Sequence, residues 1–231
     1  MFSYYGSKSK IVDYYPPPKH KKIIEPFAGS ARYSLKYWQN DVLLVDKYEI
    51  IAEIWKWLQK CSKNDILKFT SLKKGDDIRT LNLTKFESYW VGLIINQGTN
   101  EPKNIVTEYS AKGLAAFVKR VADNLFKIKH WNIIHGSYED IENIEATWFI
   151  DPPCQFGGEH YKEPSTNLNF AHLGEWCKNR NGQVIVCENT KADWLPFKPM
   201  IDMQGTMFRT TEAIWSNHKT NYDAVQQTLQ F

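Results

Sequence analysis

Short apolar runs alternate with helix-spaced apolar positions along the first sixty residues. The run at 23–25 predicts a strand, and 31–38 predicts a helix that follows a Pro-Phe-Ala-Gly-Ser turn. A second run at 42–46 predicts a strand ending at Asp46, and apolar residues over 50–58 recur at helical spacing. This strand–helix–strand–helix order predicts a parallel, doubly wound α/β sheet.

The alternation stops after residue 60 and resumes near residue 130. Apolar stripes over 86–93 and 114–125 predict helices, joined by a loop at 96–104 that is rich in Gly, Asn and Pro. We therefore expect one domain over residues 1–231, with a helical insertion at about 60–130 that touches the substrate.

The rest of the chain predicts further elements of the same sheet. A short helix is expected at 9–15, ended by the prolines at 16–18. Later elements are strands at 131–135, 147–150 and 183–187, a helix at 168–178, and an edge hairpin formed by 212–215 with the tail.

Composition narrows the class of protein. The basic excess is +3, which permits a nucleic-acid partner without requiring one, and the high aromatic content suits base stacking and a Trp-rich core equally well. The four cysteines form no C-x-x-C pair, and the histidines do not complete a ligand spacing with them, so we expect no metal and no disulfides. Because membrane-span and signal-peptide patterns are absent, we expect no membrane partner and a cytoplasmic protein of a bacterial or phage-infected host cell.

Two features of the predicted sheet favour a nucleoside cofactor. The first strand enters a turn of small residues, Glu25-Pro26-Phe27-Ala28-Gly29, which lets a ligand approach the backbone at a helix start. Asp46 ends the next strand, where a carboxylate can accept hydrogen bonds from ribose hydroxyls. A dinucleotide site would look similar, but the G-x-G-x-x-G fingerprint is missing.

The third feature, Asp151-Pro152-Pro153-Cys154, follows a buried strand and points to amine chemistry. Methylating an exocyclic amine requires the nitrogen lone pair, which is delocalised into the base. A carboxylate and a backbone carbonyl held by two prolines can accept the amine hydrogens and localise that lone pair. The target base must leave its stack to reach such a pocket.

The order of these features resembles that of the alpha-ordered DNA adenine-N6 methyltransferases, in particular the small phage- and prophage-type enzymes. Most of the chain takes part in the resemblance. It implies a Rossmann-like S-adenosylmethionine methyltransferase sheet with helices on both faces and a helical insertion. It also implies cofactor binding by Tyr4, Lys8, Glu25, Pro26, Phe27, Ala28, Gly29, Asp46, Tyr138 and Asp151. Catalysis would fall to Asp151, Pro152, Pro153 and Cys154, and the late target-base motif would include Trp215 and Asn217.

The chain departs from the family at Cys154, where the family has an aromatic residue that stacks on the flipped base. Such stacking is worth roughly 1–3 kcal/mol per base. Three explanations are open: Phe156 or Tyr161 supplies the stacking face, the base binds more weakly, or activity is lost. Ala31 also replaces the second glycine of the cofactor motif.

We therefore expect methylation of adenine N6 in DNA, with duplex DNA as the partner and S-adenosylmethionine as the cofactor. Two alternatives remain: the same reaction on RNA, and a catalytically impaired nucleic-acid-binding subunit of a methyltransferase complex, which would need a protein partner. An NAD-dependent oxidoreductase is a more distant third.

Overall fold

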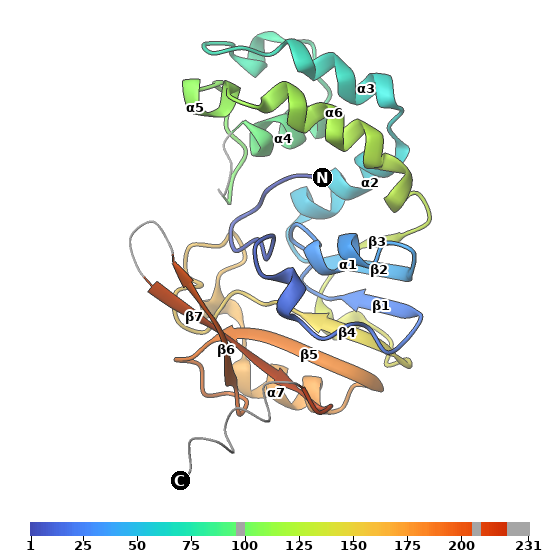
Figure 1. Ribbon diagram of the computed structural model, residues 1–231, viewed down its shortest axis with the longest axis vertical. Coiled ribbons are helices and arrows are strands. Elements are labelled where there is room, and N and C mark those ends of the chain that lie inside the picture. Colours follow the sequence, from blue (N-terminus) through green and yellow to red (C-terminus); the bar gives the residue numbers. More distant parts are fainter. Residues whose placement is uncertain (96–99, 205–208, 221–231) are drawn as a thin grey trace.

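The computed structural model describes residues 1–95, 100–204 and 209–220 (Figure 1). Its centre is a seven-stranded sheet with the order β3-β2-β1-β4-β5-β7-β6. The neighbours from β3 to β5 pair in parallel, whereas β7 is antiparallel to both β5 and β6. The strands span Lys22–Glu25 (β1), Asp41–Asp46 (β2), Asn132–His135 (β3), Ala146–Ile150 (β4), Gly182–Asn189 (β5), Lys198–Gln204 (β6) and Arg209–Ser216 (β7). The predicted α/β fold, a Rossmann-like mixed sheet, is confirmed.

Helices cover both faces of this sheet, and each face has its own apolar core. One face packs against α1 (Arg32–Lys36) and α2 (Glu49–Lys60), through a cluster that includes Ile23, Val42 and Trp55. The other face packs against α7 (Phe170–Lys178), through a cluster that includes Ile24, Trp148 and Leu173. Successive β1 residues point to opposite faces, as the two-residue period of a strand requires.

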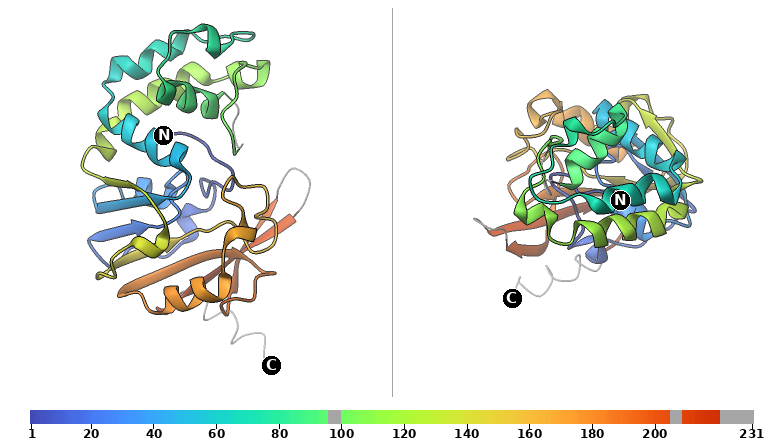
Figure 2. Two further views of the ribbon diagram at one scale, coloured as in Figure 1. Left: turned by 180° about the vertical axis from the view of Figure 1, so that it is seen from behind. Right: turned by 90° about the horizontal axis from the view of Figure 1, so that it is seen from above.

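The segment between α2 and β3 is helical and lies beyond the β3 edge of the sheet (Figures 1 and 2). The expected helices at 86–93 and 114–125 correspond to α4 (Lys85–Ile94) and α6 (Leu114–Asn124). Two shorter helices, α3 (Lys63–Leu67) and α5 (Glu108–Ala111), accompany them. Several 3-10 turns complete the structure, at Val12–Tyr14 (η1), Lys68–Ser71 (η2), Ile78–Thr80 (η3), Leu125–Ile128 (η4), Tyr138–Asp140 (η5) and Ser165–Asn167 (η6).

Two predictions of local structure were wrong. The helix expected at 9–15 is only the 3-10 turn η1, because the prolines at 16–18 leave too little chain for a helix. The edge hairpin is formed with a different partner: β7 pairs with the preceding strand, β6, and residues 221–231 of the tail lie outside the described residues. Pro199 in β6 interrupts the strand pattern, and a register shift between Pro199 and Ile201 accommodates it at the sheet edge.

The strand register brings the predicted site residues together at the carboxyl ends of the parallel strands. Glu25 is aligned with Leu44 of β2, and Ile24 with Trp148 of β4. Asp46 and Asp151 therefore extend past the end of β1 on either side, where open α/β sheets bind their ligands. Across the described residues, no helix is long and apolar enough to cross a membrane.

Candidate active site

The turn after β1 is fixed from three sides. The Gly29 N–H donates to Asp46 Oδ2 at 2.8 Å, and the Ala28 N–H donates to the Val45 carbonyl at 3.0 Å. The Trp55 indole N–H of α2 donates to the Gly29 carbonyl at 2.9 Å. Gly29 and Ala31 both adopt the left-handed region, with φ of 45° and 44°. The position that lacks the second glycine of the family motif is therefore one where the backbone favours glycine.

Asp46 has one carboxylate oxygen on each of two backbone donors. Oδ2 accepts from Gly29, and Oδ1 accepts from the Tyr48 N–H at 2.9 Å. Burial raises the pKa of Asp46 to about 6, even though these two hydrogen bonds favour the ionised form. The carboxylate lines the pocket at the end of β2, where ribose hydroxyls could donate to it.

Glu25, the last residue of β1, is a buried acid in the same pocket. Its Oε1 accepts from the Ser34 N–H of α1 at 2.7 Å, so it also fixes the start of that helix. Burial raises its pKa to about 8, and Asp151 adds to the increase.

Asp151, directly after β4, forms an ion pair with Lys8. Its Oδ1 lies 3.0 Å from the Lys8 ammonium, which also lies 3.1 Å from Oε1 of Glu212 on β7. Burial raises the pKa of Asp151 to about 6, and Lys8 opposes this increase while Glu212 adds to it. Asp151 is therefore coupled to two charges on segments far away in sequence.

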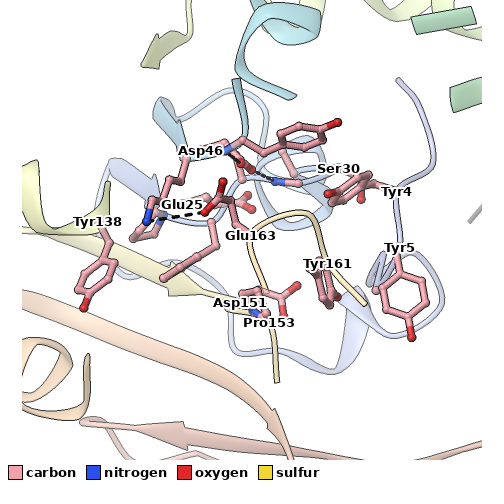
Figure 3. A pocket seen from close by; sticks show the side chains of 18 of the residues that line it. Tyr4, Tyr5, Glu25, Ser30, Asp46, Tyr138, Asp151, Pro153, Tyr161 and Glu163 are labelled. Carbon is pink, nitrogen blue, oxygen red and sulfur yellow. Dashed lines mark hydrogen bonds and ion pairs between the residues drawn. The ribbon is translucent and has the colours of Figure 1, made fainter. Parts of the chain in front are cut away.

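Aromatic rings form two opposite walls of the pocket (Figure 3). On one side Phe27 stacks on Tyr138, with ring centroids 5.5 Å apart. On the other side Tyr161 lies edge-on to Tyr4 at 6.2 Å and to Tyr5 at 5.0 Å. The structure thus joins residues predicted for the cofactor, Tyr4, Phe27 and Tyr138, with Tyr161, which was predicted for the base.

The residues after Asp151 do not all face the pocket. Pro153 lines it, whereas Pro152 is buried beside it and Cys154 is partly buried outside its lining. Burial raises the pKa of the Cys154 thiol to about 12, so at neutral pH it is a protonated thiol rather than a nucleophilic thiolate. Phe156 is exposed and lies outside the pocket lining. Of the two aromatic candidates, only Tyr161 is a pocket residue.

Trp215 and Asn217 lie apart from the pocket. Trp215 pairs with Val186 in the sheet and packs on the α7 side. The Asn217 amide accepts from the Val184 N–H at 2.8 Å and donates to the Gly182 carbonyl at 2.9 Å, so it binds the start of β5. The start of β5 and Asp151 therefore lie at opposite ends of the parallel strands.

Sequence reasoning missed the roles of three residues near the pocket. Glu212 was predicted only as the first residue of the edge hairpin at 212–215, although a charged residue directly before the apolar run 213–215 could have drawn attention to it. Arg32 donates to the Phe2 carbonyl at 2.7 Å and to Ser7 Oγ at 3.1 Å, and it lines the pocket. Glu163 also lines it and lies 3.7 Å from Lys47.

The loop that carries Tyr161 is tied to the helical insertion. The Lys162 ammonium pairs with Glu101, and the Asn100 amide donates to the His160 carbonyl. Gln97, in the predicted loop at 96–104, lies outside the described residues. The pocket wall and the insertion are therefore in direct contact.

The pocket lining has more acids than bases. Glu25, Asp46, Glu139, Asp151 and Glu163 face a cavity of about 190 Å³, against Lys8, Arg32 and Lys47. Three of these acids have a raised pKa because they are buried. A ligand with positive charge would relieve this excess, whereas a pyrophosphate would increase it. S-adenosylmethionine, which has a sulfonium, an ammonium, a ribose diol and an adenine, fits this set of groups better than a dinucleotide does.

Metal ligation finds no support in the described part of the chain, where no group of three or more His, Cys, Asp or Glu residues could hold an ion. All four cysteines are free thiols.

Comparison with known proteins gives no family. No family model matches the chain, and neither does any curated protein. Among solved structures, a putative methylase of Haemophilus influenzae is 13% identical, with a TM-score of 0.34 over 86% of this chain and 80% of that one. A putative methyltransferase of Escherichia coli is 8% identical, with a TM-score of 0.35 over 92% and 81%. A conserved hypothetical protein of Streptococcus pyogenes is 11% identical, with a TM-score of 0.35 over 86% and 88%. Likeness at this level identifies no activity, so the chemistry must be argued from the pocket.

Proposed function

We propose that this protein is an S-adenosylmethionine-dependent methyltransferase that modifies N6 of adenine in DNA. The observation that carries the proposal is the meeting of Glu25, Asp46 and Asp151 in one acid-rich pocket at the ends of three parallel strands. Ligands of open α/β sheets bind at this edge, and the acid excess favours a cationic cofactor.

The cofactor, when bound, supplies an electrophilic methyl group on a sulfonium. In this proposal Asp46 accepts hydrogen bonds from the ribose, and the Phe27–Tyr138 pair provides an apolar wall for the adenine. Glu25, at the end of β1, offers a carboxyl group toward the cationic part. Each of these residues already lines the pocket.

The target amine is held by Asp151 and its neighbours. The Asp151 carboxylate and the Pro152 carbonyl accept hydrogen bonds from the two amine hydrogens, which localises the nitrogen lone pair for transfer. Once the nitrogen holds the methyl group, it loses one of these hydrogens as a proton to the Asp151 carboxylate. Tyr161 provides the stacking face that Cys154 cannot provide, and Tyr4 and Tyr5 support its ring. The reaction needs no thiolate, in agreement with the raised pKa of Cys154.

The charge distribution supports a nucleic-acid partner. Residues 61–130 contain 12 Lys and Arg against 7 Asp and Glu, a net charge of +5, so the rest of the chain is slightly acidic. Lys119 and Arg120 of α6 are exposed. Burial lowers the pKa of the pocket residue Arg32, and the nearby Arg120 lowers this pKa further. A phosphate backbone along α6 would then lead a flipped base toward the pocket.

The test is transfer of labelled methyl from S-adenosylmethionine to duplex DNA, single-stranded DNA and single-stranded RNA, followed by digestion to nucleosides. We expect label in N6-methyladenine from duplex DNA, lost with Asp151→Ala and kept with Asp202→Ala. Asp202 is a matched acid because it lies on β6, outside the pocket lining.

Other results would change the proposal in defined ways. Label found only in RNA would identify RNA, rather than DNA, as the substrate. Cofactor binding with no transfer to any polymer would contradict the enzyme and favour a binding subunit. Transfer that appears only with Cys154→Tyr would mean that Tyr161 does not replace the missing aromatic. Full transfer by Asp151→Ala would refute the role of Asp151.

A further inference from the structure

We infer that Glu212 is a positioning residue that acts on Asp151 through Lys8 and strengthens the Asp151 carboxylate as a hydrogen-bond acceptor. Its consequence for catalysis rests on the proposed function, but the contact itself does not. Glu212 belongs to β7 and lies outside the pocket lining, so it cannot act by touching a ligand there.

The geometry is a buried chain of three contacts. The Tyr15 hydroxyl donates to Glu212 Oε1 at 2.5 Å, and the same oxygen lies 3.1 Å from the Lys8 ammonium. The ammonium lies 3.0 Å from Asp151 Oδ1. Lys8, Glu212 and Tyr15 are each at least nine-tenths buried, so water does not screen these charges effectively.

The arrangement divides one cation between two carboxylates. If Lys8 had Asp151 as its only partner, the full ammonium charge would weaken, as an acceptor, the carboxylate that must accept the amine hydrogens. Glu212 shares the ammonium with Asp151, and Tyr15 holds the Glu212 carboxylate in place. Among the described residues, Asp151 Oδ2 accepts no hydrogen bond, and the Asp151 side chain lines the pocket, where a substrate amine could donate to this oxygen.

A structural ion pair alone does not explain this arrangement. Burying a second acid beside one lysine leaves the cluster with an excess negative charge, which is unfavourable for folding. Other titratable groups also act on Asp151 from the elements around it: Glu25 from β1, Glu188 and Cys187 from β5, Cys154, Tyr15 and Tyr161. Among the described residues, only Lys8 forms an ion pair with Asp151, and Glu212 contacts that same ammonium.

The two partners must therefore affect Asp151 in opposite directions. Two carboxylates that contact one ammonium lie within about 6 Å of each other, where like charges shift a pKa by about one unit. Glu212→Gln keeps an oxygen for Lys8 and Tyr15 but removes the negative charge, so the pKa of Asp151 should fall by about that much. Lys8→Met removes the cation, so the pKa of Asp151 should rise.

The experiment is a carbon-13 NMR titration of the aspartate carboxyls in the full chain, without cofactor or DNA. Asp151→Asn assigns the signal, and Thr211→Val serves as the matched control because Thr211 precedes Glu212 on the same strand. Shifts of opposite sign in Glu212→Gln and Lys8→Met, with none in Thr211→Val, would support the inference. If Glu212→Gln does not fold, Glu212→Asp tests the same contact, since its shorter side chain withdraws the charge and should also lower the pKa.

Activity then separates the two proposals. The acid limb of the pH profile of kcat/KM should move with the titration, down in Glu212→Gln and up in Lys8→Met. An unmoved Asp151 signal in Glu212→Gln overturns the inference, even if methyl transfer is slower, because that is what a purely structural role would give. If the Asp151 pKa shifts in opposite directions in Glu212→Gln and Lys8→Met but the protein transfers no methyl, the inference about Glu212 stands and the proposed function is refuted.

Discussion

Replacing Gly6 by alanine is a direct test of Tyr161 as the stacking face. Gly6 has a φ of 74°, and a Cβ on it would lie 2.0 Å from the Tyr161 hydroxyl oxygen. Carbon and oxygen atoms cannot approach so closely, so the Tyr161 ring must move away from residue 6. The change is made on the N-terminal segment and leaves the chemistry of the tyrosine intact.

The structure separates two effects of this methyl group. The left-handed backbone costs an alanine about 1 kcal/mol, which for a chain of this length lowers Tm by about 2–4 °C. Displacing the ring removes base stacking, worth about 1–3 kcal/mol, or about 5- to 150-fold in affinity. The first effect is general, and the second is specific to this position.

Gly113→Ala is the matched control. Gly113 has a φ of 80°, and a Cβ there meets nothing within 4 Å, so it adds the same strain without a collision. We expect similar losses of Tm in the two variants by calorimetry. The dissociation constant for a duplex with an unpaired target adenine, measured by fluorescence anisotropy, should rise only in Gly6→Ala.

A double-mutant cycle completes the test. In a Tyr161→Ala background the collision disappears, so Gly6→Ala should have little further effect on DNA affinity. The reasoning is refuted if Gly6→Ala binds DNA like the wild type, or if its effect is the same with and without the Tyr161 ring.

Four further predictions follow from single residues. Because the pKa of Glu25 rises to about 8 on folding from an ordinary value near 4.5, the folded state holds a proton that the unfolded state has lost, and stability should fall as pH rises between these values. Glu25→Gln should flatten that slope in urea unfolding between pH 6.5 and 7.5, and an unchanged slope would contradict the assignment. Cys154→Ala should keep methyl transfer within about threefold, or about 0.7 kcal/mol, since the thiol lies outside the pocket lining; loss of activity with intact folding would count against this. Asn217→Ala should lower the free energy of unfolding by about 1–2 kcal/mol through its two lost hydrogen bonds and leave cofactor affinity unchanged in calorimetry. Arg120→Gln should reduce the slope of log affinity for DNA against log salt by about one, whereas Lys178→Gln on α7 should not, and equal slopes would exclude α6 from the interface.

The sheet was predictable where its sequence signals are local. The strands at β1, β2 and β4 are short apolar runs with clear boundaries, and the acids that end them, Asp46 and Asp151, follow directly. Edge strand β6 lacks that pattern, because Pro199 and Asp202 interrupt it, so the sequence pointed to the wrong partner for β7.

The site was only partly predictable, because strand direction decides which residues meet. Glu212 and Asn217 are near neighbours in sequence, but an antiparallel strand rises about 3.4 Å per residue. Glu212 therefore lies beside the end of β5, whereas Asn217 lies near its start. Nothing local to Asn217 reveals that it binds β5 rather than substrate. Likewise, the choice between Phe156 and Tyr161 depends on how the loop after Asp151 folds back over the pocket.

The contact between Tyr15 and Glu212 spans 197 residues, and this distance bears on how the protein matures during synthesis. The ribosome makes Lys8 and Asp151 well before β7, so a nascent chain can form the Lys8–Asp151 pair without its second acid. Closing so long a loop is entropically costly and slow. The sheet core and the pocket can therefore form first, while the acceptor strength of Asp151 is set only when β7 docks, which would make pairing of β7 the last step in building a competent enzyme.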